Sequence, residues 1–251
     1  MKPKIHLLSN ARHGSSYMWH VLSKYHSPAS LVTPMSDDPD SGMSRRLFNE
    51  TFSRDGHRYH NNLTDQQIQH NFTLISQTDR YVMKTHSYEL DILAKCNLLE
   101  DFKNIDHYRI MLVRRNIFES TLSTAISKIK NQWTNHTNTD SMTVPLENFS
   151  VAFEFQWNMI QELVTNKYNL SYDETIYFED LTFWPRKDFC NTKLCNQDLD
   201  TLIKVHIRDN LYHAPNKYEI VINYNELYDY CLKLISLKSC NFGKFNETTL
   251  L

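Results

Sequence analysis

Residues 4–17 read KIHLLSNARHGSSY, and this stretch is the strongest indication of the fold class. Its first part, Lys4–Ser9, is a short apolar run that suits a buried strand. Residues 16–25 then place apolar side chains at helical spacing, and residues 10–15 form a tight loop between the two elements. A strand, a loop and a helix in this order begin the alternation that is typical of α/β proteins.

The same alternation continues along the chain. We expect strands at residues 80–84, 108–113 and 175–178, helices at 92–102, 118–129, 151–168, 203–211 and 224–237, and a possible strand at 218–222. This order predicts one α/β domain over residues 1–251, with a central parallel sheet flanked by helices on both faces and ligands at the carboxyl ends of its strands. Residues 28–80 and 130–150 are polar and are expected to be insertions that face an acceptor. The first of them is expected to form only loops and short helices.

Composition narrows the class of protein. A hydrophobic fraction of 41% and a charged fraction of 22% are typical of a globular chain, and the formal net charge of −2 gives no bulk attraction to nucleic acid or to an anionic membrane. An anion site must therefore be a local group of basic residues. Residues 1–9 lack an export signal, and no apolar run is long enough to span a membrane, so we expect a soluble cytoplasmic protein.

The cysteines are odd in number and lack the paired spacing of a metal site. Reduced thiols are expected in a cytoplasm, with a Cys190–Cys195 or a Cys231–Cys240 disulfide as the alternative.

Residues 10–17 have the composition of an anion-binding loop. Consecutive backbone N–H groups at a helix N-terminus form a concave anion site, Ser15 and Ser16 add hydroxyl donors, and Arg12 adds a permanent charge. Gly14 allows close approach of the backbone to a ligand. The loop is not that of a nucleotide triphosphatase, because the Gly-Lys-Ser/Thr ending is missing. A plain helix N-cap with a surface arginine and histidine is the alternative interpretation.

Residues 82–86 (VMKTH) form a strand that ends in a cation and an imidazole. Lys84 and His86 are alternate residues, so they point to the same side of the sheet. This pairing suits a cation that stabilises a transferring anion beside a general base. The alternative is that His86 is an ordinary hydrogen-bonded surface histidine.

Residues 108–116 form an apolar strand that delivers Arg115 to its carboxyl end. Ser123 follows one residue more than two helical turns later, on the next predicted helix. A bidentate charge and a hydroxyl donor make a good phosphate pair. The alternative is that Arg114 and Arg115 merely flank a helix.

Four stretches in this order resemble the sulfotransferases that use 3'-phosphoadenosine 5'-phosphosulfate (PAPS). The loop around Arg12 is similar to the 5'-phosphosulfate loop of that family, and residues 84–86 match the Lys-Thr-His of its cytosolic branch. Residues 115–123 match, in register, the segment that binds the 3'-phosphate in that branch, and residues 178–181 resemble its Tyr-Glu-Asp-Leu/Met segment. The resemblance implies a P-loop-like topology of the sulfotransferase type.

The resemblance also implies an activity and a set of site residues. The protein would transfer a sulfuryl group from PAPS to a hydroxyl or amine of a small-molecule, carbohydrate or peptide acceptor, without a metal and without a nucleic-acid or membrane partner. His86 would be the general base, with Glu89, His13 and His20 as alternatives, and Lys84 and Arg12 would stabilise the charge on the transferring group. The nucleotide would be bound by Arg12, His13, Gly14, Ser15, Ser16, Tyr17, Arg115, Ser123 and Phe178.

The chain departs from the family pattern at several positions. Ala11 and His13 stand where the loop of the family has Pro and Ser, and Phe178 replaces a Tyr whose hydroxyl reaches the adenine. The Arg-Lys-Gly segment that lies near the C-terminus of family members is absent, and residues 241–244 resemble it only weakly. Two rival functions therefore stay open: a small-molecule kinase, and a non-catalytic nucleotide-binding or interaction protein on the same fold.

Overall fold

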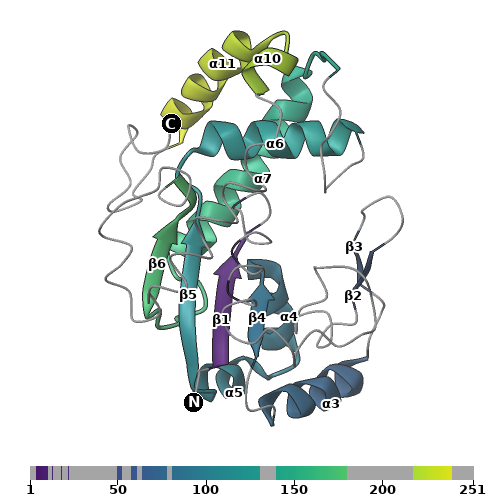
Figure 1. The fold of residues 1–251 in the computed structure, drawn as a ribbon, viewed down its shortest axis with the longest axis vertical. Helices are drawn as coiled ribbons and strands as arrows, with labels where there is room; N and C mark the ends of the chain where they lie inside the picture. Colours follow the sequence, from purple (N-terminus) through teal and green to yellow (C-terminus); the bar gives the residue numbers. More distant parts are fainter. Residues whose placement is uncertain are drawn as a thin grey trace.

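The computed structural model describes residues 4–10, 13, 18, 22, 50–52, 58–60, 64–77, 81–130, 140–179 and 217–238. At its centre lies a four-stranded sheet in the order β4 (Val82–Thr85), β1 (Lys4–Ser9), β5 (His107–Val113) and β6 (Glu174–Tyr177). Every pair of neighbours in this sheet is parallel, as predicted from the alternation of strands and helices. The carboxyl ends of all four strands therefore lie at the same edge (Figure 1).

The first strand lies inside the sheet and is buried along nearly all of its length. Ile5, Leu7 and Leu8 are no more than 1% exposed, and β1 pairs with β4 on one side and with β5 on the other. Its partners are distant in sequence, since Ile5 is in register with both Val82 and Tyr108. The loop after β1 thus leaves the sheet between the ends of β4 and β5.

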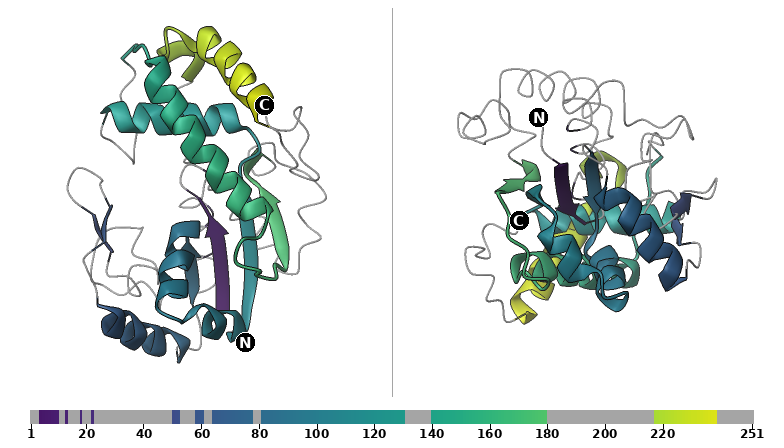
Figure 2. Two further views of the ribbon diagram at one scale, coloured as in Figure 1. Left: turned by 180° about the vertical axis from the view of Figure 1, so that it is seen from behind. Right: turned by 90° about the horizontal axis from the view of Figure 1, so that it is seen from below.

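Both faces of the sheet are covered. On one face, side chains of the strands pack with those of α4 (Ser87–Lys95), α5 (Leu99–Asn104) and α7 (Leu146–Val164) in one apolar cluster, which includes Leu8, Met83, Val113, Leu90, Leu93, Phe102 and Leu163. Seen from behind, α7 runs diagonally across the sheet (Figure 2). The alternate strand residues point to the opposite face, and they are equally buried: Ile5, Leu7, Ile110 and Leu112.

A second apolar cluster lies beyond the carboxyl edge of the sheet. It joins α6 (Ile117–Lys130), α7, α10 (Lys217–Ile220) and α11 (Tyr224–Leu237), which gather at one end of the molecule in Figure 1. Phe118 of α6 makes edge-to-face contacts with Tyr224 and Tyr228 of α11. Cross-helix aromatic contacts of this kind add to the stability that apolar burial provides.

One predicted helix is in fact two. The helix expected at 92–102 is split between α4 and α5, because Asn97 adopts a left-handed conformation with φ 58°. The N–H of Leu98 donates to the carbonyl of Leu93 (2.8 Å), which is the bond that closes a Schellman motif at the end of α4. Asn tolerates a positive φ better than most residues, so the chain turns here and starts again as α5.

Two further sequence predictions were wrong in part. The possible strand at 218–222 is the short helix α10, followed by an isolated bridge between Val221 and Met142. The stretch expected to hold only loops and short helices contains the 12-residue α3 (Asp65–Ser76) and a two-stranded ladder of β2 (Glu50–Phe52) and β3 (Arg58–His60). A capping box between Thr64 and Gln67 starts α3.

Other predictions fall on residues with little or no description. The helix expected at 203–211 lies outside the described residues, and of the helix expected at 16–25 only Met18 and Leu22 are described, both helical and buried. Cys96 and Cys231 are buried free thiols, so the Cys231–Cys240 disulfide does not form. Among the helices of the described segments, none combines the length and the apolar character that a membrane crossing requires.

Candidate functional site

The carboxyl edge of the sheet gathers the predicted site residues that the structure describes. Lys84 and His86 come from the end of β4, Arg115 follows β5, and Phe178 follows β6. His13 lies in the loop after β1 and accepts from the backbone N–H of Arg114, directly after β5. The remaining predicted residues of that loop, Arg12, Gly14, Ser15, Ser16 and Tyr17, lie outside the described residues.

His86 is held in one tautomer. Its Nδ1 lies 2.7 Å from the backbone carbonyl oxygen of Ser9, which can only accept a hydrogen bond. Nδ1 of the neutral ring therefore carries the proton, and Nε2 carries the lone pair that a general base needs. The backbone N–H of His86 donates to the carboxylate of Glu89, in the first turn of α4. The histidine is thus fixed through its ring and through its backbone.

Asn10 connects this histidine turn to the rest of the core. Its side-chain oxygen accepts from the N–H of Ser87 (3.2 Å), and its side-chain N–H group donates to the carbonyl of Met159 in α7 (2.9 Å). Asn10 directly follows β1 and is fully buried. The loop after β1 is therefore tied at its first residue to both α4 and α7.

Lys84 and His86 share a face of the sheet. β4 ends at Thr85, but His86 keeps an extended backbone (φ −102°, ψ 163°), so the alternation of side chains continues through it. Thr85, on the other face, bonds the Nε2 of His6 at 2.7 Å. Lys84 is only 4% exposed, so a cationic group is held within the protein one strand away from the loop after β1.

Glu179 organises the turn between β5 and α6. Its carboxylate accepts from the backbone N–H groups of Arg115 (3.0 Å) and Asn116 (2.9 Å), and each neighbouring guanidinium Nε, of Arg114 and of Arg115, lies 3.9 Å from it. The side chain of Asn116 in turn accepts from the N–H of Glu119 (2.8 Å) and so caps α6. One carboxylate thereby holds the turn that carries the predicted phosphate-binding arginine.

The two arginines of this turn lie over the aromatic residues that end β6. The Arg115 guanidinium is 4.4 Å from the ring centre of Tyr177, and that of Arg114 is 4.9 Å from the ring centre of Phe178. Arg114 also approaches Glu119 at 3.7 Å. Burial lowers the pKa of Arg114, and the two carboxylates beside it, of Glu119 and Glu179, act in the opposite direction. Phe178 therefore stacks on Arg114 in this structure.

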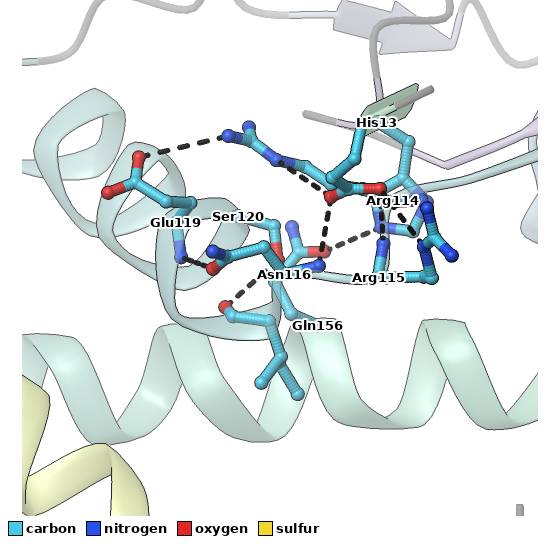
Figure 3. Close-up of polar contacts among 9 residues, drawn as sticks. His13, Arg114, Arg115, Asn116, Glu119, Ser120 and Gln156 are labelled. Carbon is cyan, nitrogen blue, oxygen red and sulfur yellow. Dashed lines mark hydrogen bonds and ion pairs between the residues drawn. The ribbon is translucent and has the colours of Figure 1, made fainter. Parts of the chain in front are cut away.

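His13 is fully buried and hydrogen-bonded through both ring nitrogens. Its Nδ1 accepts from the backbone N–H of Arg114 (3.3 Å), and its Nε2 lies 3.2 Å from the side-chain oxygen of Gln156 (Figure 3). Burial, followed by the charge of Arg114, lowers its pKa to about 3, while Gln156 and the carbonyl of Leu112 oppose the shift. The ring is neutral at physiological pH, and its two bonds join the loop after β1 to the end of β5 and to α7.

Ser123 lies in the second turn of α6 and is half-buried. The hydroxyl of Ser127, one turn later, donates to its backbone carbonyl at 2.7 Å. Ser123 is thus on the helix that the Arg115 turn begins, as its spacing in the sequence predicts.

Glu179 and Gln156 are two residues of this region for which the sequence predicts no role. Gln156 shares the buried face of α7 with Phe149, Phe153 and Ile160, at the spacing of one helix face. A polar residue at a core position is expected to have buried hydrogen-bond partners, so this spacing is a signal that could have found Gln156. Glu179 belongs to the stretch 178–181 that the resemblance includes, but its partners lie more than 60 residues earlier in the chain, so the motif alone did not indicate what it binds.

The described part of this edge carries the basic side chains of Lys84 and Arg115 and the imidazole of His86. Within the segments that the structure describes, no group of three or more His, Cys, Asp or Glu side chains could hold a metal ion. Comparison with protein-family models, with curated proteins and with solved structures finds no match for this chain.

Proposed function

We propose that this protein is a PAPS-dependent sulfotransferase with a P-loop-like fold. One observation carries the proposal: the loop that resembles a phosphosulfate loop follows β1, and two of the three other motifs lie at the carboxyl ends of β4 and β5, the neighbours of β1 on either side. Three stretches that are far apart in sequence thus meet at one edge of the sheet. Ligands of open parallel sheets bind at this edge.

In the proposed reaction, His86 accepts the proton of an acceptor hydroxyl or amine on Nε2. The acceptor oxygen or nitrogen forms a bond to sulfur, and the bond between sulfur and the bridging oxygen breaks. The electron pair of that bond stays on the phosphate oxygen of the departing adenosine 3',5'-bisphosphate. The Nδ1–H bond of His86 to the carbonyl of Ser9 supports this role, because it leaves the lone pair on Nε2.

The cations and donors of the edge are proposed to stabilise charge. Lys84, Arg12 and the N–H groups of the loop act on the bridging and equatorial oxygens of the transferring group. Arg115 and Ser123 hold the 3'-phosphate, which distinguishes PAPS from ATP, and Phe178 packs near the adenine. Positioning and electrostatics supply most of the rate enhancement in such a transfer.

The first test is thermal stabilisation by nucleotides. A ligand that binds the native state raises the apparent stability in proportion to RT ln(1 + [L]/Kd). Adenosine 3',5'-bisphosphate should raise the melting temperature clearly more than AMP or ATP at equal concentration, with or without Mg²⁺. Equal stabilisation by AMP and the bisphosphate contradicts the proposal, and Mg²⁺-dependent stabilisation by ATP supports a small-molecule kinase instead.

A non-catalytic nucleotide-binding protein on this fold is the second candidate. The 4% exposure of Lys84 favours it, because a cation that acts on a transferring group has to reach that group. Transfer of ³⁵S from labelled PAPS to a panel of phenols, amines, sugars and tyrosine peptides separates the two candidates. Tight binding of the bisphosphate with no transfer to any acceptor supports the second.

A further inference from the structure

A directional chain of hydrogen bonds crosses the interior behind the candidate site. Four groups take part after the N–H of Arg114: the ring of His13, the side chain of Gln156, the hydroxyl of Thr124 and the carbonyl of Ser120. These groups come from the loop after β1, from α7 and from α6. Figure 3 shows the links that run from the turn after β5 through His13 to Gln156 on α7.

The donor of every hydrogen bond in this series can be assigned, starting from the carbonyl of Ser120. The carbonyl of Ser120 only accepts, so the hydroxyl of Thr124 donates to it (2.9 Å) and must accept from the side-chain N–H of Gln156 (2.7 Å). The oxygen of Gln156 then faces the Nε2 of His13, which carries the ring proton. The Nδ1 of His13 is left with a lone pair, which accepts the N–H of Arg114.

The three side chains that form this series of hydrogen bonds are fully buried. His13, Gln156 and Thr124 have no exposed surface, and water cannot replace a lost partner there. A buried polar group without a hydrogen-bond partner costs free energy. Only one arrangement of these hydrogen bonds satisfies every group, so other arrangements are strongly disfavoured. It therefore fixes His13, in the loop after β1, against the turn after β5.

In the proposed function, those two segments bind the two ends of one nucleotide. The loop after β1 holds the 5'-phosphosulfate and the turn after β5 presents Arg115 to the 3'-phosphate. We propose that Gln156 is a positioning residue that sets the separation between the two phosphate-binding segments, and thereby the selectivity for nucleotides phosphorylated at both the 3' and the 5' position. This inference rests on the proposed function, and Gln156 itself touches no ligand in it.

The expected signature is a loss of selectivity rather than a general loss of binding. A ligand with both phosphates gains from a correct separation, whereas a ligand with one phosphate engages only one segment. Gln156→Leu should weaken adenosine 3',5'-bisphosphate about tenfold, while AMP and adenosine 3'-monophosphate change by less than about twofold. Calorimetric titration of the three nucleotides on the whole chain measures this.

Three controls make the test specific. Ile160→Val changes a buried residue of the same helix outside the hydrogen-bond chain, so it should lower the melting temperature without changing the ratio of affinities. Thr124→Val, a milder change at the next link, should shift the ratio in the same direction. In an Arg115→Ala background, Gln156→Leu should have no further effect on the bisphosphate, because the anchor that it positions is gone.

The ring of His13 gives a readout that needs no ligand. Nitrogen NMR should show the Nε2–H tautomer in the wild type and a mixture of tautomers in Gln156→Leu. If the wild type prefers the bisphosphate and Gln156→Leu keeps the same preference, this inference is overturned and the proposed function stands. If the wild type binds the bisphosphate no more tightly than AMP, the proposed function fails and this inference fails with it.

Discussion

The two ends of the parallel sheet both bury histidines and an arginine, but they use them differently. At the amino end, beneath α5, His6, Tyr81, His107 and Arg109 form what we call the amino-end cluster. Tyr81 bonds the ring of His107, and Arg109 donates to three backbone carbonyls at the end of α5. At the carboxyl end, the side chains of Glu89, His13 and Glu179 accept from the backbone N–H groups of His86, Arg114 and Arg115, in the turns after β4 and β5.

Buried histidines with a lowered pKa occur at both ends, so burial and a shifted pKa do not distinguish the proposed site from the amino-end cluster. Desolvation lowers the pKa of His107 to about 3, the same value as for His13, and it also lowers that of His6. The amino-end cluster is nevertheless closed around a helix end, whereas the ring of His86 has its lone pair directed by a bond to a backbone carbonyl. Geometry at the sheet edge, and not titration, separates the two regions.

The largest expected effect tests whether chemistry is confined to the carboxyl end. His86→Gln should reduce turnover by about 10² to 10⁴ with nucleotide binding retained, since this is the usual contribution of a general base. His107→Gln should leave turnover near the wild-type value. Steady-state kinetics with an identified acceptor measure both. An unchanged rate and pH profile for His86→Gln would remove His86 from the mechanism and leave Glu89 as the next candidate.

The next effect compares an arginine at each end. Arg115→Ala should weaken binding of the 3'-phosphorylated nucleotide by about 1.5 to 3 kcal/mol, the contribution of a hydrogen bond to a charged group. Arg109→Ala should leave that affinity unchanged, but it removes the donor from the α5 carbonyls and should lower the free energy of unfolding by about 1 to 3 kcal/mol. Calorimetry and urea unfolding separate the two outcomes. Equal losses of affinity for AMP and the bisphosphate in Arg115→Ala would mean that Arg115 does not bind the 3'-phosphate.

The pH dependence of stability sharpens the comparison further. His13 and His107 have pKa values of about 3 in the folded protein and close to 6.5 when unfolded, so the unfolded chain binds more protons between these values. Their contribution to stability is complete above pH 6.5 and falls with decreasing pH, by about 1.4 kcal/mol per pH unit for each histidine.

Urea unfolding between pH 6.5 and 4.5 measures these slopes. His13→Asn and His107→Asn should each reduce the slope by about one proton, but only the His13 variant should also change the affinity for the bisphosphate. If both variants changed nucleotide binding, the amino-end cluster would not be independent of the site.

The smallest effect concerns two hydroxyls. The hydroxyl of Ser9 is buried and makes no hydrogen bond in the described structure, so Ser9→Ala should change the free energy of unfolding by less than about 0.5 kcal/mol. Thr85→Val removes the partner of His6 and should cost about 1 kcal/mol. Thermal melts of the two variants test this. A loss above about 1 kcal/mol in Ser9→Ala would show that the serine hydroxyl has a partner in solution.

The sequence was sufficient where the signal is local. The apolar runs predicted β1 and β5 closely, and helical spacing predicted α6 and α11, because each pattern is complete within one element. The break at Asn97 depends on one residue in a left-handed turn, and periodicity across it looks continuous. The Asn itself was the only local indication that a helix ends there, because Asn is common in the left-handed position after a helix.

Only those residues of the candidate site that belong to sequence motifs could be predicted. Lys84 lies in the last part of β4, and His86 and Arg115 follow β4 and β5, so the rule that parallel strands end at one edge places them together. The residues that fix the turns at this edge are distant in sequence: Glu179 lies more than 60 residues after the N–H groups of Arg115 and Asn116 that it binds, and Gln156 lies 143 residues after His13. Such contacts depend on the packing of whole elements, which no local pattern of residues records.

The central position of β1 has a consequence for how the molecule folds. Its two neighbours begin 77 and 103 residues later in register, as the pairs Ile5 with Val82 and Lys4 with His107 show. Large loops must therefore close before β1 gains any hydrogen-bonded partner, and a high share of such distant contacts slows folding. Until then β1, an inner strand of the sheet, exposes both of its edges, which makes the early chain prone to association with other copies.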